Sequence, residues 1–324
     1  MIEKTYTSPD TNYTFQTYYS PPKHSTLVFV AHHGAGSSSQ SFRLFQQSLE
    51  SSDPIVIPGL FLFDMRGHAN TNLLNQSNVD SNYNLSINQL IDDFAFLIEI
   101  LFKKINKDAK VCLIGHSLGG SVLTKYLLRN SVYNSHISGL VVVDIVEELA
   151  ISSLPVMESY LCRLPSSFDS VDSVIQYYID HGQISNRNSL NFSIPPLVKQ
   201  NATGAFEFVI DLKRTKPYWF EWFKDLSRDF ISIPNSIAKL LILANNNYLD
   251  KHLIIGQMQG KFQLVVLNNT GHFIQEDIPH NFTQTILDFV ERNDYEVYHR
   301  SNSSLSTNAI MLNKFNEIWK SKQL

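Results

Sequence analysis

The chain has 324 residues, enough to bury one large core, and its charge is nearly balanced, with 26 Lys+Arg against 30 Asp+Glu and a formal net charge of -4. It has no basic stripe and no acidic run, so we expect neither nucleic acid nor an anionic membrane as a partner. No apolar run is long enough to span a bilayer, and the polar start M-I-E-K-T lacks the apolar stretch of a signal peptide. Two cysteines, Cys112 and Cys162, do not make a disulfide framework. We therefore expect a cytoplasmic or nuclear protein.

Short apolar runs alternate with amphipathic stretches along most of the chain. In chain order, the sequence predicts strands at 27–31 and 60–64, a helix at 87–102, a strand at 111–114, a helix at 118–128, strands at 140–144, 240–244 and 263–267, and a closing helix at 282–290. Asn84 or Ser86 is the expected cap of the first helix. Apolar strands without polar alternation, separated by helices, indicate an α/β fold with a mostly parallel central sheet and helices on both faces.

The segment from about 148 to 233 breaks this alternation. It has a largely helical pattern, is rich in Ser and Asn, and ends in an aromatic cluster at 218–223 (Y-W-F-E-W-F). We interpret it as a helical cap inserted over the strand ends of a single domain, residues 1–300. Residues 301–324 form a polar tail in which Met311, Phe315, Ile318 and Trp319 are spaced for a short C-terminal helix.

The strongest chemical signal is G-H-S-L-G at 115–119, a G-x-S-x-G motif between a predicted strand and a predicted helix. In this context the serine sits on a sharp turn that exposes its hydroxyl, and the glycines let strand and helix approach closely. The alternative is an ordinary serine in a glycine-rich turn, which the strand–turn–helix context disfavours. Ser117 is therefore the candidate nucleophile.

A second glycine-rich loop, H-H-G-A-G-S at 32–37, follows the first predicted strand. An esterase needs two backbone N–H groups directed at the oxyanion that develops during the reaction. One is expected from the residue after the nucleophile, Leu118, and the other from an early loop of this type. Ala35 is the preferred second donor, with Gly36 as the alternative.

The general base must take the proton of Ser117, and histidine suits neutral pH. The chain has 11 histidines, but His272 in T-G-H at 270–272 lies late in the chain, after the last predicted strand, where this fold class carries its base. His116 belongs to the turn of the nucleophile and is expected to pack there, while His33 and His68 are expected to be surface or structural residues. The sequence has no His/Cys cluster with ligand spacing, so we expect no metal, and no organic cofactor is required.

The acid that orients the histidine has two candidates. Many α/β-hydrolases place it after the penultimate strand, but Asn247, which carries no charge, occupies that position, and Asp250 comes three residues later. Asp144 ends an earlier strand, where a catalytic acid could also lie. Asp144 is preferred, with Asp250 as the runner-up and a helix cap as the structural alternative for Asp144.

From 27 to 290 the chain resembles the protein phosphatase methylesterases, a family of α/β-hydrolase fold. The similar segments are V-D-I-V-E at 143–147, H-G-Q-I at 181–184, Y-W-x-x-W-F at 218–223, I-G-Q-M-Q-G-K-F-Q at 255–263 and G-H-x-x-x-E-D at 271–277. The segment at 255–263 is the most specific, because other α/β-hydrolases have no reason to carry it. Members of the family place the acid after the strand that follows the nucleophile helix, which independently supports Asp144.

This resemblance implies a serine carboxylic ester hydrolase that removes the methyl ester from the C-terminal leucine of the type 2A protein phosphatase catalytic subunit, and that binds this subunit. Ala35 stands where animal members usually have glycine, which leaves the backbone donor intact. The long acidic insertion of some members is not evident. Two alternatives are a small-molecule carboxylesterase or lipase, and a non-catalytic phosphatase-binding protein. The segment at 255–263 argues against the first, and the presence of Ser117, Asp144 and His272 argues against the second.

Overall fold

The computed structural model describes residues 1–52, 56–73, 84–129, 131–245 and 248–293, so the predicted tail and Asn247 lie outside the described residues. Within these ranges nine strands form one sheet in the order β1-β2-β4-β3-β6-β7-β10-β11, with β5 paired to β2. The pairs from β4 to β11 are parallel, whereas the pairs of β2 are antiparallel. The strands are β1 (Ile2–Thr7), β2 (Tyr13–Ser20), β3 (Leu27–His32), β4 (Gly59–Phe63), β5 (Asn72–Leu73), β6 (Lys110–His116), β7 (Ile137–Val143), β10 (Ala238–Ala244) and β11 (Gln263–Leu267).

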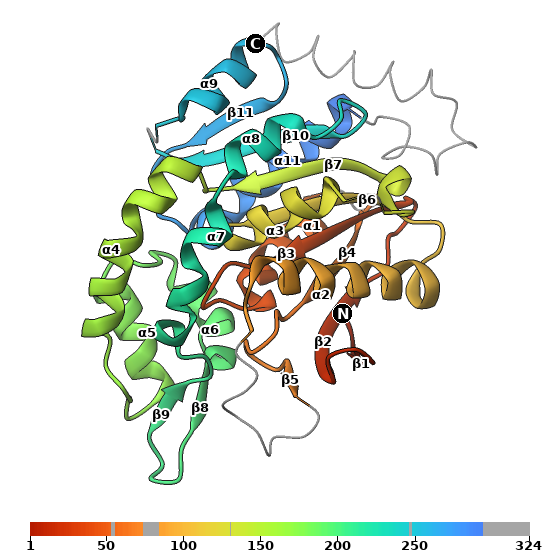
Figure 1. The fold of residues 1–324 in the computed structure, drawn as a ribbon. Coiled ribbons are helices and arrows are strands. Elements are labelled where there is room, and N and C mark those ends of the chain that lie inside the picture. The colour runs from red at the N-terminus through yellow and green to blue at the C-terminus, as the bar shows by residue number, and fades with distance from the viewer. Residues whose placement is uncertain (53–55, 74–83, 130, 246–247, 294–324) are drawn as a thin grey trace, which may run out of the picture.

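Helices cover both faces of this sheet (Figure 1). Alternate residues of β3 show the division, because Val28 and Val30 join one core while Phe29 and Ala31 join the other. The first core packs against α2 and α3, and the second against α1 and α11. The helices around the sheet are α1 (Arg43–Ser52), α2 (Ile87–Ile100), α3 (Leu118–Leu127), α9 (Lys251–Met258), α10 (Ile274–Asp277) and α11 (Pro279–Asn293).

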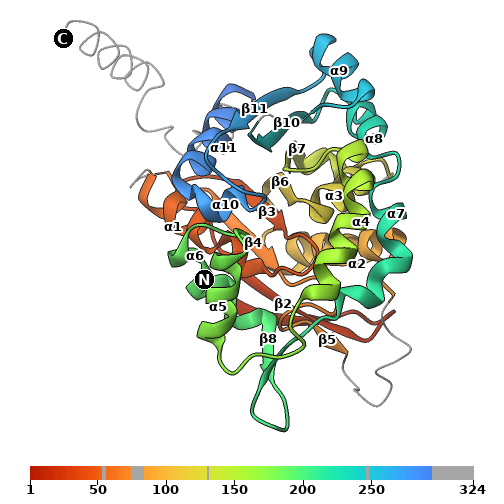
Figure 2. The same ribbon diagram turned by 90° about the vertical axis from the view of Figure 1, so that its left-hand side faces the viewer.

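Between β7 and β10 the chain leaves the sheet and builds the segment interpreted above as a cap. Figure 1 shows its first part on the side toward which β7 points, and Figure 2 shows α4, α5 and α7 from the front. The segment has a small core of its own, which includes Val174, Leu190 and Ile194. Its elements are α4 (Glu147–Arg163), α5 (Val171–Asp180), α6 (Arg187–Ser193), β8 (Val198–Gln200), β9 (Phe206–Phe208), α7 (Trp219–Phe223) and α8 (Leu226–Ser232).

All six predicted strands and all three predicted helices are present, with ends that differ by a few residues. The first predicted helix is α-helical to Ile100 and continues as a π-helix over Leu101–Ile105. Ser86 is its cap, since its hydroxyl accepts the Gln89 N–H at 3.4 Å. Elements that the sequence analysis did not predict are the hairpin of β1 and β2, β5, α1, the small hairpin of β8 and β9, α9 and α10.

Candidate active site

Ser117 lies at the sharp turn between β6 and α3. Its backbone has φ 51° and ψ -121°, a strained conformation for a residue other than glycine. The turn is held at the end of the sheet because the Ser117 N–H donates to the Val143 carbonyl at 2.9 Å. A Cβ on Gly119 would lie only 2.3 Å from the His32 carbonyl oxygen, so only glycine fits there. The glycine after the serine is thus required where α3 passes the end of β3.

The structure brings His272, in the loop after β11, together with Asp144, at the end of β7, although β10 lies between these two strands. The His272 Nδ1 lies 2.7 Å from Asp144 Oδ2. The other carboxylate oxygen of Asp144 accepts the Ala244 N–H at 2.7 Å, so the carboxylate is held by the backbone of β10. Because a carboxylate only accepts, His272 Nδ1 carries the proton and Nε2 is left as the acceptor.

Asp250, the runner-up for the acid, has another place in the structure. Its Oδ1 accepts the Leu253 N–H at 3.1 Å at the start of α9, and its Oδ2 accepts the Ser227 hydroxyl. Asp250 is therefore a buried helix cap that also joins α8 to α9. The family-specific segment at 143–147 contributes a second cap, because Glu147 accepts the N–H groups of Asp225 and Ser227.

The glycine-rich loop after β3 passes beside Ser117. A Cβ on Gly34 would lie 3.1 Å from the Ser117 Cβ, and the loop turns through a hydrogen bond from Ser37 N–H to the Gly34 carbonyl. The Gly36 N–H donates to His68 Nε2 at 3.0 Å. In the described part of the chain, neither Ala35 N–H nor Leu118 N–H has a hydrogen-bond partner.

Three further histidines lie buried around this site. His116 Nε2 donates to the His272 carbonyl at 2.9 Å, which ties the turn of the nucleophile to the loop of the base. Burial lowers the pKa of His116 well below its usual range and that of His68 to about 4. His33 has a similarly lowered pKa, again because it is buried. All three rings are buried, so none of them is at the surface, one of the two places that the sequence analysis allowed for His33 and His68.

One pocket contains the three candidate triad residues, and another borders the glycine-rich loop. One has a volume of about 240 Å³ and is lined by all three candidate triad residues together with apolar side chains, namely Ile145, Val146, Leu149, Ala150, Met157, Phe223 and Leu243. The other has a volume of about 370 Å³ and lies between Gly36, Ser37 and His68 on one side and the inserted segment on the other. Within the described residues, no hydrogen bond joins the Ser117 hydroxyl to His272, although both line the smaller pocket.

Two acids that the sequence analysis noted without a role, Glu276 and Asp277, follow His272 in the chain and bond to the inserted segment. The Asp277 carboxylate accepts the Gly271 N–H at 2.8 Å and, from the inserted segment, the Ser185 N–H at 2.7 Å. Its neighbour Glu276 accepts the Ser189 hydroxyl at 2.7 Å, and burial raises the pKa of Glu276 to about 7. The spacing G-H-x-x-x-E-D was the only signal of these contacts in the sequence.

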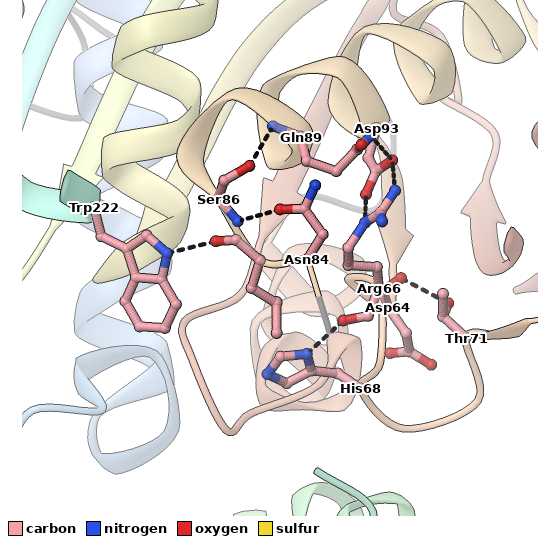
Figure 3. Close-up of polar contacts among 10 residues, drawn as sticks. Asp64, Arg66, His68, Thr71, Asn84, Ser86, Gln89, Asp93 and Trp222 are labelled. Carbon is pink, nitrogen blue, oxygen red and sulfur yellow. Dashed lines mark hydrogen bonds and ion pairs between the residues drawn. The ribbon is translucent and has the colours of Figure 1, made fainter. Parts of the chain in front are cut away.

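The aromatic cluster of the inserted segment is mostly core. Trp219, Trp222 and Phe223 are buried, and the Trp222 indole N–H donates to the Leu85 carbonyl at 2.7 Å. Figure 3 shows this indole pointing at the backbone just before α2. Phe220 is the exposed member, at 55%. Because they are buried, Trp219, Trp222 and Phe223 are not available as contacts for a partner protein.

Two searches over the described residues bear on metals and membranes. They contain no group of three or more His, Cys, Asp or Glu side chains placed to hold a metal ion. They also contain no helix that is both long and apolar enough to cross a bilayer.

Comparison with known proteins identifies the family. Residues 27–285 match the model of the alpha/beta hydrolase family. The chain is 40% identical over 302 residues to protein phosphatase methylesterase 1 of Debaryomyces hansenii, an alignment covering 90% of this chain and 76% of that protein. The Schizosaccharomyces pombe protein of the same name is 38% identical, with 87% and 80% covered. This chain belongs to the protein phosphatase methylesterase family.

Solved structures confirm the predicted α/β-hydrolase fold. The E-2-(acetamidomethylene)succinate hydrolase superposes with a TM-score of 0.70 at 16% identity, covering 90% of this chain and 99% of that one. An esterase of Mycobacterium tuberculosis superposes with a TM-score of 0.65 at 14% identity, covering 90% and 93%. With the relatives above, these matches make the chain a carboxylic ester hydrolase of the methylesterase family, as its sequence predicted.

Proposed function

We propose that this protein removes the methyl ester from the C-terminal leucine of a type 2A protein phosphatase catalytic subunit, with Ser117, His272 and Asp144 as its triad. The observation that carries the proposal is the 2.7 Å hydrogen bond between His272 Nδ1 and Asp144 Oδ2 beside the strained turn of Ser117. The names of the curated relatives supply the substrate class.

The proposed mechanism follows from the hydrogen bonds of the site. With Nδ1–H donated to Asp144, His272 Nε2 accepts the Ser117 proton as Oγ attacks the ester carbonyl. Ala35 and Leu118 N–H stabilise the resulting oxyanion. Methanol leaves with the proton from His272, and a water activated by the same base then releases the free carboxylate. The Ser117 side chain closes on His272 when substrate binds, a contact that is often loose before binding.

The smaller pocket supports a substrate with a small apolar side chain. Its lining beside Ser117 is largely apolar, and its volume of about 240 Å³ accommodates an isobutyl group and the ester. The choice of the methylesterase over a lipase on the same fold rests on the relatives, which are methylesterases by name. Because such a phosphatase works inside the cell, we place the protein in the cytoplasm or nucleus.

A fluorophosphonate probe tests the catalytic half of the proposal. We expect the wild-type protein to be labelled at Ser117 and to hydrolyse a leucine methyl ester peptide faster than long-chain acyl esters. Labelling at another residue, or a preference for long acyl chains, would overturn the proposal. Absence of labelling would instead favour the non-catalytic phosphatase-binding protein.

A further inference from the structure

Two buried histidines outside the triad join the glycine-rich loop at 33–37, here called the oxyanion loop, to the 64–71 loop after β4. His68, in the 64–71 loop, accepts the Gly36 N–H at 3.0 Å. His33, in the oxyanion loop, accepts the Met65 N–H at 2.9 Å. Their ring centroids lie 5.3 Å apart. Each loop thus supplies one imidazole that accepts a backbone N–H of the other.

The hydrogen bonds of both rings define one tautomer. The Nδ1 of His68 lies 2.9 Å from the Arg66 carbonyl, and that of His33 lies 2.8 Å from the Gly34 carbonyl. Because a carbonyl only accepts, each Nδ1 carries a proton, and because a backbone N–H only donates, each Nε2 is unprotonated. Both rings are therefore neutral, in agreement with their burial.

The 64–71 loop is itself fixed to the body of the protein, as Figure 3 shows. The Arg66 guanidinium forms a buried ion pair with Asp93 of α2, with Nη2 at 2.5 Å from Oδ1. The Thr71 hydroxyl donates to the Asp64 carbonyl at 2.7 Å. The imidazole of His68 therefore extends from a rigid support rather than from a free loop.

The hydrogen bond from Gly36 to His68 determines which N–H groups of the oxyanion loop remain available to a substrate. Gly36 has φ +72°, a left-handed backbone conformation that favours glycine in the turn at 34–37. Its N–H is taken by His68, whereas that of Ala35 has no partner in the described part of the chain. Of the two donors that the sequence predicted for this loop, Ala35 is thus the one whose N–H a substrate can use.

We propose that His68, with His33 as its reciprocal partner, is a positioning residue of the oxyanion hole, which holds the Gly36 N–H so that the Ala35 N–H stays directed at the reacting carbonyl oxygen. The inference rests on the proposed function, since it concerns the same site. Displacing a reacting group by about 1 Å can lower the rate by about 10²-fold, and loss of one oxyanion donor lowers it by about 10² to 10³-fold.

Two substitutions of His68 test the two hydrogen bonds of its ring one at a time. In His68→Asn the side-chain amide reaches the Nδ1 position and keeps the bond to the Arg66 carbonyl, but nothing accepts the Gly36 N–H. In His68→Gln the longer side chain places its amide oxygen near the Nε2 position, where it accepts the Gly36 N–H. Both variants are neutral and of similar polarity, so they form a matched pair.

The experiment measures four quantities for wild type and both variants: kcat and KM on p-nitrophenyl acetate, the inhibition constant of a small trifluoromethyl ketone, and Tm. We expect His68→Asn to lower kcat by about 10²-fold with little change in KM, because the oxyanion forms only in the transition state. The ketone, which forms an oxyanion adduct with serine, should lose affinity by the same factor. His68→Gln should recover most of both losses.

Several outcomes would overturn the inference. One is a His68→Asn enzyme with wild-type kcat and ketone affinity. Another is an equal loss of kcat in both variants that follows an equal fall in Tm, which would mean a merely structural role. If Ser117→Ala keeps its esterase activity and ketone affinity, the proposed function fails and takes this inference with it. If Ser117→Ala loses both while His68→Asn does not, only the positioning role is wrong.

Discussion

At the scale of single residues, the orientation of Asp144 distinguishes it from the other carboxylate near the site. One oxygen of Asp144 faces His272 at 2.7 Å, and the other is held by the Ala244 N–H at 2.7 Å. Both oxygens of Asp250 accept hydrogen bonds from groups at α8 and α9 instead. The first carboxylate is arranged to fix a histidine tautomer, and the second to stabilise a helix start.

Substitution of each acid by asparagine should therefore have different effects. Asp144→Asn should lower kcat by about 10⁴-fold with little change in Tm, because the orienting carboxylate is lost. Asp250→Asn should keep kcat near the wild-type value and lower stability by about 1 kcal/mol, or roughly 2–4 °C in Tm, through a weaker cap. The measurement is kcat on an aryl ester beside a thermal melt. A dead Asp250→Asn enzyme with an active Asp144→Asn enzyme would reverse the assignment of the acid.

The sequence predicted these residues to different extents. Ser117 and His272 could be located because each stands in a short motif at a fixed place in the order of strands. Asp144 could be preferred over Asp250 but not assigned as the acid, because a position at a strand end does not reveal which way the side chain turns. The role of His68 could not be predicted, because it depends on the contact between two loops that are about thirty residues apart in the chain.

At the scale of elements, α10 joins the loop of His272 to the inserted segment through Asp277. Its carboxylate accepts Gly271 N–H and the Thr270 hydroxyl on one side, and the Ser185 N–H and hydroxyl on the other. Hydrogen bonds to a charged group stabilise by about 1.5–3 kcal/mol each. The position of His272 thus depends on a segment almost ninety residues earlier in the chain.

Asp277→Asn should weaken this connection. The charge is lost, and one amide N–H₂ must face a backbone donor, so we expect roughly 2 kcal/mol less stability and about a 10-fold lower kcat. Asp288→Asn is the matched control, because Asp288 is exposed on α11 and accepts from Gln284 one turn away. Melting and aryl ester kinetics measure both effects. If the two variants behave alike, Asp277 does not hold the loop of the base.

Glu276, next to Asp277, predicts a dependence of stability on pH. Burial raises the pKa of Glu276 to about 7, above its ordinary value of 4.5, so the folded protein binds this proton more tightly than the unfolded chain does. The stability that comes from the proton is fully present below about pH 4.5 and is lost as the pH rises through about 7. Glu276→Gln removes this loss, which amounts to at most about 3 kcal/mol.

We therefore expect the Tm of Glu276→Gln, relative to wild type, to increase between pH 5 and pH 8. Thermal melts of both proteins in one buffer series measure the difference. A constant difference in Tm across that range would show that Glu276 titrates in the folded protein as it does in the unfolded chain.

Which elements could be predicted follows from their surroundings. The six strands that the sequence predicted are apolar runs because helices cover both sides of most of them, and apolar runs are easily seen. They are β3, β4, β6, β7, β10 and β11. The β1–β2 hairpin was missed because β1 is an edge strand in which only Tyr6 is buried, so its residues carry little apolar signal. The β8–β9 hairpin was missed for a similar reason, since each strand has three residues.

At the scale of the whole molecule, the inserted segment borders the pocket of Ser117 and presents a surface beside it. Its tryptophans are buried, so recognition of a protein partner must use other side chains. Leu149 lines the smaller pocket and is 40% exposed, Val156 on the same helix is 67% exposed, and Phe220 on the adjoining α7 is 55% exposed. Under the proposed function, we expect the folded phosphatase to cover these exposed apolar side chains.

The enzyme should act on the intact methylated phosphatase with a much higher kcat/KM than on its free methylated tail peptide, since a leucine ester alone offers little binding energy. Val156→Asp should lower kcat/KM on the intact phosphatase by about 10-fold and leave the tail peptide and aryl esters unaffected. Val132→Asp is the control, because Val132 is 82% exposed in a turn outside the inserted segment. Equal values of kcat/KM for phosphatase and peptide would confine recognition to the pocket.

The most direct test of the account is the loss of the C-terminal methyl group from the intact methylated phosphatase catalytic subunit, followed by mass spectrometry with wild type and Ser117→Ala. We predict complete demethylation by the wild type and none by the variant, because loss of the nucleophile in such a triad lowers kcat by about 10⁶-fold. The melting curves of the two proteins should coincide. Demethylation at the same rate by Ser117→Ala, or a wild-type protein that hydrolyses aryl esters but leaves the phosphatase methylated, would contradict the account.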